Sequence, residues 1–144
     1  MMSIKIIIIG KIKEKVYQKR ILEYKKWIKL DIQTEIIILK DSNTKKLDQK
    51  LSSYIKSEGH KICVSEEGSK LSSKQFSKFI FDINQDLTFF IGGPRGHSEI
   101  VRTGANSILS LSNMTLPHEM ALLVLTEQIF RAISIQKGSK YHRE

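Results

Sequence analysis

The sequence predicts an α/β fold with a mostly parallel sheet, because strand-like and helix-like segments alternate along its 144 residues. Residues 4–9, IKIIII, are almost entirely β-branched, which is typical of a parallel strand covered on both faces. The segment after this run repeats apolar residues at helical spacing, at Tyr17, Ile21, Tyr24 and Ile28. No linker, repeat or low-complexity tract interrupts the alternation, so we expect one domain over residues 1–144.

The middle elements are each predicted from their own periodicity. Residues 32–39, IQTEIIIL, predict a second strand, and a second helix is indicated by Leu47, Leu51, Tyr54 and Ile55. Residues 61–65, KICVS, predict a third strand. The polar stretch EEGSKLSS at 66–73 predicts a loop. A third helix is then expected to begin near Ser73, with apolar residues at Phe76, Phe79, Ile80 and Ile83.

The last third of the chain adds two strands and two helices. LTFFIG at 87–92 predicts a fourth strand, a short helix is expected at 98–105, and ILSLS at 108–112 predicts a fifth strand. A long final helix opens at Pro117 and continues to about Ile135, since proline is favoured in the first helical turn. Its apolar face is wide enough to predict burial against both the core and a second subunit, through Leu122, Leu123, Leu125 and Ile129.

The positive charge is concentrated in the first half of the chain. The net charge is +9, and residues 1–72 hold 16 basic against 9 acidic side chains, whereas residues 73–144 hold 8 against 6. A basic field of this kind attracts polyanions such as RNA. Lysines on ordinary solvated faces would give the same count, so the charge alone leaves both interpretations open.

The single cysteine and the length of the apolar runs indicate a cytoplasmic protein. Cys63 has no second cysteine to pair with, so no internal disulfide forms and a reducing compartment is expected. Its apolar neighbours in ICV predict a small core residue. The N-terminal SIKIIIIG is too short for a membrane span, and no run approaches the length of about 18 residues that a span needs.

A ligand site is predicted where three loops follow three strands. In parallel sheets ligands bind outside the carboxyl ends of the strands, and the loops at 65–72, 92–97 and 112–117 gather there. The second contains the glycine turn GGPRG, which lacks the spacing of a dinucleotide fingerprint or a phosphate loop. The turn is explained equally well by close approach of the backbone to a ligand and by tight chain reversal alone.

The sequence offers no familiar catalytic or metal constellation. The histidines His60, His97, His118 and His142 are scattered without metal-ligand spacing, so no metal site is expected. No nucleophile elbow and no pair of catalytic carboxylates is present. A site of this kind suits chemistry that the ligand itself carries, as with an activated group donor.

Four short motifs resemble the ribosomal RNA large-subunit methyltransferase H family: IGGPRG at 91–96, SLSNMTLPHEM at 110–120, EQIFRA at 127–132 and YHRE at 141–144. This family is a small member of the SPOUT class of S-adenosylmethionine-dependent methyltransferases. The resemblance implies N3-methylation of a pseudouridine in large-subunit ribosomal RNA. It also implies a C-terminal trefoil knot and a homodimer, neither of which follows from periodicity.

The resemblance further implies two groups of site residues. The methyl-donor pocket would be formed by Val64, Gly93, Ser112, Asn113, Met114, Thr115, Leu116 and Pro117. The C-terminal tail would carry the chemistry, with His142 as a base, Arg143 holding a phosphate or a developing oxyanion, and Tyr141 stacking on or positioning the substrate. Arg131 is assigned to an interface or to the edge of the core.

Two departures and two alternative functions stay open. Leu122 stands where relatives typically have arginine, and Phe130 where they have tyrosine, so a polar contact near the donor or the dimer interface is missing or supplied from elsewhere. A SPOUT-like enzyme acting on transfer RNA and a non-catalytic basic module that binds ribosomal RNA fit the same charge pattern. Because no separate RNA-binding domain is evident, the expected substrate is an assembled ribosomal particle.

Overall fold

Five parallel strands form the central sheet, in the order β2-β1-β4-β3-β5. The computed structural model describes residues 2–143. The strands are β1 (Ser3–Ile9), β2 (Gln33–Leu39), β3 (His60–Lys70), β4 (Leu87–Ile91) and β5 (Ser107–Ser110). The α/β class and the parallel sheet expected from the alternating segments are confirmed, and β5 lies at one edge.

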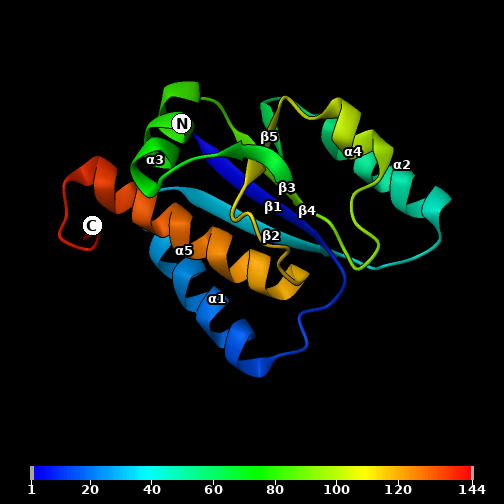
Figure 1. The fold of residues 1–144 in the computed structure, drawn as a ribbon, viewed down its shortest axis with the longest axis horizontal. Helices are drawn as coiled ribbons and strands as arrows, with labels where there is room; N and C mark the ends of the chain where they lie inside the picture. The colour runs from blue at the N-terminus through cyan, green and yellow to red at the C-terminus, as the bar shows by residue number, and fades with distance from the viewer. Residues whose placement is uncertain (1, 144) are drawn as a thin grey trace.

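Helices cover both faces of this sheet and give three layers (Figure 1). One face is covered by α1 (Lys15–Ile28), α3 (Ser73–Ile83) and α5 (His118–Lys137), and α5 lies between the other two. The opposite face is covered by α2 (Thr44–Ile55) and α4 (Glu99–Gly104), which pack together. None of the described helices is both long and apolar enough to cross a membrane.

Alternation along β1 explains why its sequence is apolar throughout. Ile4, Ile6 and Ile8 belong to the core beneath α1, α3 and α5, whereas Ile7 and Ile9 belong to the core beneath α2 and α4. Successive side chains of a strand point to opposite faces, so a strand with two covered faces has no polar side. The same division separates Phe89 from Phe90 on β4.

The predicted loop at 66–73 is wrong for most of its length, because β3 continues to Lys70. The strand is irregular between Val64 and Ser69, after which Ser69 pairs with Leu109 and Lys70 with Ser110 of β5. Pairing with an edge strand supplies backbone hydrogen bonds that do not depend on apolar side chains. The polar composition of this segment therefore did not indicate a loop reliably. Ser72 then caps α3 through a capping box with Gln75, close to the predicted helix start.

The apolar face of α5 is largely buried within its own chain, so most of its width is explained without a second subunit, and contact with one stays a prediction. Leu122, Leu125 and Ile129 are at most 1 % exposed. Since α5 packs between α1 and α3 and lies on the sheet, three of its sides contact the same chain. Only Leu123 of the predicted interface residues is partly exposed. The width of the apolar face therefore carries no information about a dimer.

Candidate functional site

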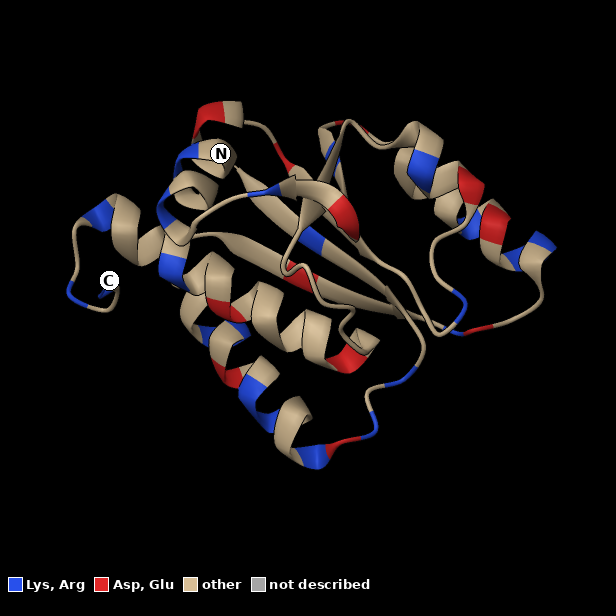
Figure 2. Cartoon of the chain, viewed as in Figure 1, with Lys and Arg blue, Asp and Glu red and all other residues tan. Residues whose placement is uncertain are grey.

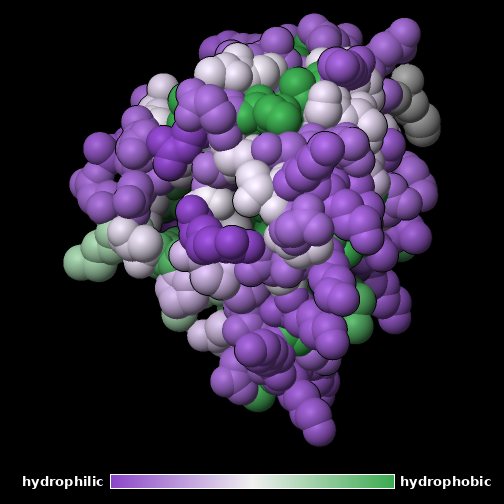
Figure 3. Space-filling model, turned by 90° about the vertical axis from the view of Figure 1, so that its right-hand side faces the viewer, coloured by the Kyte–Doolittle hydropathy of each residue, from purple (hydrophilic) through white to green (hydrophobic). Residues whose placement is uncertain are grey.

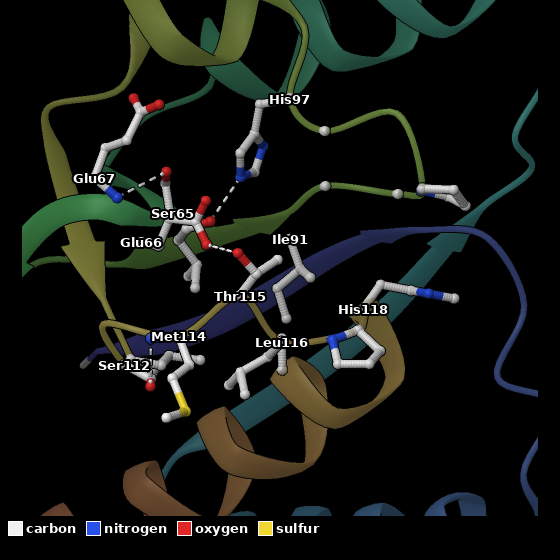
Figure 4. A pocket seen from close by; sticks show the side chains of 18 of the residues that line it. Ser65, Glu66, Glu67, Ile91, His97, Ser112, Met114, Thr115, Leu116 and His118 are labelled. Atoms are coloured by element: carbon white, nitrogen blue, oxygen red, sulfur yellow. Dashed lines mark hydrogen bonds between the residues drawn. The ribbon is translucent and has the colours of Figure 1, made fainter.

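A cavity of about 570 Å³ opens at the carboxyl ends of β3, β4 and β5 (Figure 4). The side of the molecule toward which the strands run is largely hydrophilic, and it is hollowed where paler, less polar residues gather (Figure 3). The cavity is lined by the three segments expected from the strand-end rule, by which ligands bind outside the carboxyl ends of parallel strands. These segments are the end of β3, the glycine turn after β4, and the segment between β5 and α5.

The residues assigned to donor binding do come together at this cavity, with one exception. Its lining includes Val64, Gly93, Ser112, Met114, Thr115, Leu116 and Pro117. Asn113 is not among the lining residues. The start of α5 closes the cavity with His118 and Ala121. The roles of these residues in donor binding stay predictions, because lining a cavity does not by itself identify a ligand.

The first half of the glycine turn is tight, because the turn's own backbone and β1 leave no room for side chains at Gly92 and Gly93. The amide of Gly96 donates to the carbonyl of Gly93 at 2.9 Å, and Gly96 has a φ of 78°. A Cβ on Gly92 would lie 2.9 Å from the carbonyl carbon of Gly96. A Cβ on Gly93 would lie 3.0 Å from Cγ2 of Ile9 and 3.1 Å from its carbonyl oxygen. The turn is thus both a tight reversal and a wall of the cavity.

Substitution of Gly93 is therefore expected to act through β1. In Gly93→Val the new side chain presses on Ile9 and displaces the turn, so we expect a loss of stability of about 1–3 kcal/mol together with weaker donor binding. Gly138→Asn is the matched control, since its position is open, asparagine tolerates its positive φ, and it lies outside the cavity. Thermal unfolding and calorimetry with S-adenosylmethionine measure both effects. Unchanged stability and affinity in Gly93→Val would contradict this account of the turn.

His97 joins the glycine turn to the end of β3. Its Nε2–H donates to the carbonyl of Val64 at 2.6 Å. Burial lowers the pKa of His97, and the hydrogen bond to Val64 only partly opposes that effect. The imidazole is therefore neutral near pH 7 and ties two walls of the cavity together. No local sequence pattern predicts this contact, because Val64 and His97 are far apart along the chain.

Two carboxylates, Glu66 and Glu67, also line the cavity, although the sequence did not identify them as site residues. The hydroxyl of Thr115 donates to Glu66, which links the end of β3 to the segment before α5 (Figure 4). Glu67 lies beside it and forms an ion pair with Arg102 at 3.4 Å. Both glutamates lie in the segment 65–72, which the sequence predicts to be part of the ligand site. Only the course of β3 shows that these side chains reach the cavity.

The proposed catalytic tail lies away from this cavity within one chain. The tail follows the C-terminal end of α5 (Figure 1), whereas the residues of α5 that line the cavity, His118 and Ala121, belong to its N-terminal end. A helix of 20 residues separates them, which is about 30 Å at 1.5 Å per residue. Tyr141, His142 and Arg143 are not among the residues that line the cavity. Their catalytic roles stay predictions, and one chain alone does not bring them to the donor site.

The tail is nevertheless ordered against α5 and α1. The Tyr141 hydroxyl donates to Glu127 at 2.8 Å, and its ring packs on Phe130 with the ring centroids 4.8 Å apart. Arg131 stacks on Tyr141, with its guanidinium carbon 4.9 Å from the ring centroid, and pairs with Glu127 at 2.7 Å. Arg131 is thus at the edge of the core, one of the two places expected for it. Burial, followed by the bonds to Glu127 and Tyr24, raises the pKa of Tyr141.

Comparison with known proteins assigns the fold and the family. The family model described as "Predicted SPOUT methyltransferase" matches residues 2–142. The chain belongs to the SPOUT methyltransferase family. This confirms the resemblance found in the motifs and the methyltransferase class inferred from it. Curated relatives are similar over their whole lengths, and several carry the name "Ribosomal RNA large subunit methyltransferase H".

Three of these relatives come from different organisms. The protein from Streptococcus uberis is 40% identical over 159 residues, covering 99% of this chain and 100% of the relative. The protein from Prochlorococcus marinus is 41% identical over 141 residues, covering 97% and 95%. The protein from Dictyoglomus thermophilum is 37% identical over 158 residues, covering 98% and 99%.

Solved structures share the fold at low sequence identity. A probable methylase family protein from Haemophilus influenzae aligns with a TM-score of 0.59 and 12% identity, covering 99% of this chain and 71% of that one. The SpoU methyltransferase AviRb from Streptomyces viridochromogenes, solved in complex with AdoMet, aligns with a TM-score of 0.52 and 12% identity. This SPOUT methyltransferase covers 59% of the length of AviRb.

The two departures from the family pattern lie outside the cavity. Leu122 is 1 % exposed in the core and does not line the cavity. Phe130 packs against Tyr24, Trp27 and Tyr141. Both positions are occupied by side chains that suit the apolar surroundings of this SPOUT methyltransferase, so neither removes a polar group from the donor pocket.

Two further features of this SPOUT methyltransferase concern metal-ligating groups and the single cysteine. Within residues 2–143, no group of three or more metal-ligating side chains of the His, Cys, Asp and Glu types is found. Cys63 is 1 % exposed, and its burial raises the pKa of the thiol to about 11. The thiol is therefore protonated at neutral pH and serves as a small core side chain, as its sequence neighbours predicted.

Proposed function

We propose that this SPOUT methyltransferase transfers a methyl group from S-adenosylmethionine to N3 of a pseudouridine in large-subunit ribosomal RNA. The observation that carries the proposal is the strand-end cavity, with its combined apolar and acidic walls, in a chain similar over its full length to methyltransferases named for large-subunit ribosomal RNA. The protein is expected to act in the cytoplasm, as the lone buried cysteine suggests.

The cavity suits a donor that is apolar over much of its surface and positively charged. When bound, S-adenosylmethionine supplies an electrophilic methyl group on a sulfonium, which leaves as a neutral thioether. Val64, Ile91 and Leu116 offer apolar contacts for a flat ring, while exposed backbone of the glycine turn offers hydrogen-bonding groups. Glu66 places a carboxylate where the cationic donor would lie. The residues of this chain thus chiefly hold and orient the reacting groups.

Neutralising Glu66 is expected to weaken donor binding. Glu66→Gln keeps the size of the side chain but removes its charge, so the donor dissociation constant should rise about three-fold to ten-fold, as for a partly exposed charge interaction worth about 1 kcal/mol. Glu67→Gln is the matched control, because Glu67 is already paired with Arg102. Calorimetry measures both. Equal affinities in the wild type and Glu66→Gln would remove Glu66 from the donor site.

The basic surface supports an RNA substrate. Basic side chains gather along α1 and the loop before it (Figure 2). They are Lys15, Lys19, Arg20, Lys25 and Lys26 on the helix, and Lys11 and Lys13 in the loop. Most of these side chains are exposed. A row of cations on one helix gives sequence-independent attraction to phosphates, and its contribution falls with salt. We assign recognition of an assembled ribosomal particle to this helix together with the tail.

A homodimer is proposed because one chain leaves the tail and the cavity apart. Tyr141, His142 and Arg143 follow the far end of α5, so a second copy must supply them if they act at the methyl group. An antiparallel arrangement of two α5 helices would bring each tail to the partner's cavity. The return of the chain from edge strand β5 to α5 over the middle of the sheet supports the trefoil knot of the SPOUT class.

Methyl transfer to ribosomal particles tests the proposal. Purified protein is incubated with isotopically labelled S-adenosylmethionine and, separately, with 70S ribosomes, free large-subunit RNA and bulk transfer RNA. The expected result is one labelled nucleoside from the ribosomal substrate, identified by mass spectrometry as a methylated pseudouridine. Label in transfer RNA alone would favour the alternative SPOUT substrate, and no donor binding at millimolar concentration would favour a non-catalytic RNA-binding module.

A further inference from the structure

Arg131 fixes which nitrogen of His142 carries the proton. Nη1 of Arg131 lies 3.1 Å from Nδ1 of His142. A guanidinium has only hydrogen-bond donors, so Nδ1 must be the acceptor in this contact. A neutral imidazole has one N–H, which is then on Nε2. The lone pair that a general base needs is thus already engaged.

Arg131 is itself held rigidly, so the contact is built into the fold. Its Nη2 donates to Glu127 at 2.7 Å and its Nε donates to the same carboxylate at 3.2 Å. The Tyr141 hydroxyl also donates to that carboxylate, at 2.8 Å. The side chains of Arg131 and Glu127 are only 23% and 18% exposed. The guanidinium therefore has one orientation, and that orientation directs a donor at His142.

The other ring nitrogen lacks a partner. Nε2 of His142 is buried and has no hydrogen bond to any part of the chain that the structure describes. Buried donors are nearly always paired in native proteins. An acceptor on another molecule that docks against the tail would satisfy this group.

We propose that His142 donates a hydrogen bond from Nε2 to a carbonyl oxygen of the target base, and that Arg131 is the positioning residue that imposes this tautomer. The inference rests on the proposed function and replaces the role of base expected for His142. When the imide N–H of the base breaks, its proton passes to water and the electron pair stays on the ring, shared between nitrogen and the two flanking carbonyl oxygens. A preorganised donor at one of these oxygens stabilises that anion and so favours the nucleophile.

Two substitutions at residue 142 separate a donor from a base. In His142→Gln an amide N–H can replace Nε2–H, but the side chain cannot accept a proton at neutral pH. His142→Ala removes both functions. We expect His142→Gln to retain methyl transfer to ribosomes within about ten-fold of wild type, whereas His142→Ala loses about 10²-fold to 10³-fold. Equal, large losses in both folded variants would overturn the donor role.

The pH profile gives a second readout. The ionisable groups around His142 are Arg131 and Glu127 on α5, Tyr141 on the tail, and Tyr24 on α1, which contacts Tyr141. With a donor role, kcat of the wild type and of His142→Gln should follow parallel curves between about pH 6 and pH 8, the range in which histidine titrates. A low-pH fall in the wild type that is absent from His142→Gln would restore His142 as the base.

A double-mutant cycle tests the positioning role of Arg131. Arg131→Met should slow the wild type several-fold more than it slows His142→Gln, because only an imidazole has a tautomer to be set. Equal effects in the two backgrounds would show that Arg131 supports only the packing of the tail. Donor affinity and thermal unfolding are measured for every variant. An inactive wild type on ribosomes would instead contradict the proposed function.

Discussion

Removal of residues 141–144 is expected to leave the methyl donor bound but to slow methyl transfer by about 10²-fold to 10³-fold, as loss of a preorganised hydrogen-bond donor does. None of the described tail residues, 141–143, lines the cavity, so calorimetry should give nearly the wild-type affinity for S-adenosylmethionine. Fold stability should change little, because the Tyr141 side chain is at the surface and 40% exposed. Methylation of ribosomes at the wild-type rate would show that the tail is only a terminus.

Mixing the truncated protein with the impaired donor-site variant shows whether the tail acts in its own chain or in a partner. The truncated chain keeps its cavity, whereas full-length Gly93→Val keeps its tail. If the active site is shared between two subunits, refolding the two together restores part of the activity through mixed dimers. Activity that stays absent, although mixed dimers are detected, would contradict a shared site.

Leu125→Asp is expected to unfold the protein or to cost at least about 3–5 kcal/mol, because it buries a carboxyl group without a partner and removes a large core side chain. Leu125 is 0% exposed and belongs to the core beneath α1, α3 and α5. Chemical denaturation followed by circular dichroism measures the loss. A stable, folded Leu125→Asp protein would show that α5 does not pack as described.

Leu123→Asp is the partner experiment on the same helix. Leu123 is only partly buried in one chain, so this change should cost far less stability than Leu125→Asp. If Leu123 faces a second subunit, the variant should sediment as a monomer where the wild type sediments as a dimer. A monomeric wild type at micromolar concentration would contradict the dimer itself.

The spacing of apolar residues predicted the type of an element correctly where that spacing reflects which faces of the element are buried. The isoleucines of β1 predicted a strand covered on two faces, and both faces are covered. The apolar spacing from Tyr17 to Ile28 predicted α1. The strand-end rule located the cavity, because in a parallel sheet the loops after the strands must meet at one edge.

Long-range contacts decided what periodicity could not. The strand β3 continues through polar residues to Lys70 because Ser69 and Lys70 pair with the backbone of β5, and that pairing depends on where β5 lies. Glu66 and His97 are held at the cavity by hydrogen bonds to residues that are remote in sequence. Glu66 bonds to Thr115, and His97 bonds to the carbonyl of Val64. The motifs of the family suggested the residues of the tail.

The sequence by itself thus determined the α/β class, the order of its elements and the three segments that form the cavity, because these depend on local periodicity and on the direction of parallel strands. Only the tertiary structure decided that the apolar face of α5 is buried in its own core, that the tail lies a helix length from the cavity, and that Arg131 meets Nδ1 of His142. Each of these depends on how distant segments pack, and distances between packed elements are not encoded in the spacing of residues along one segment.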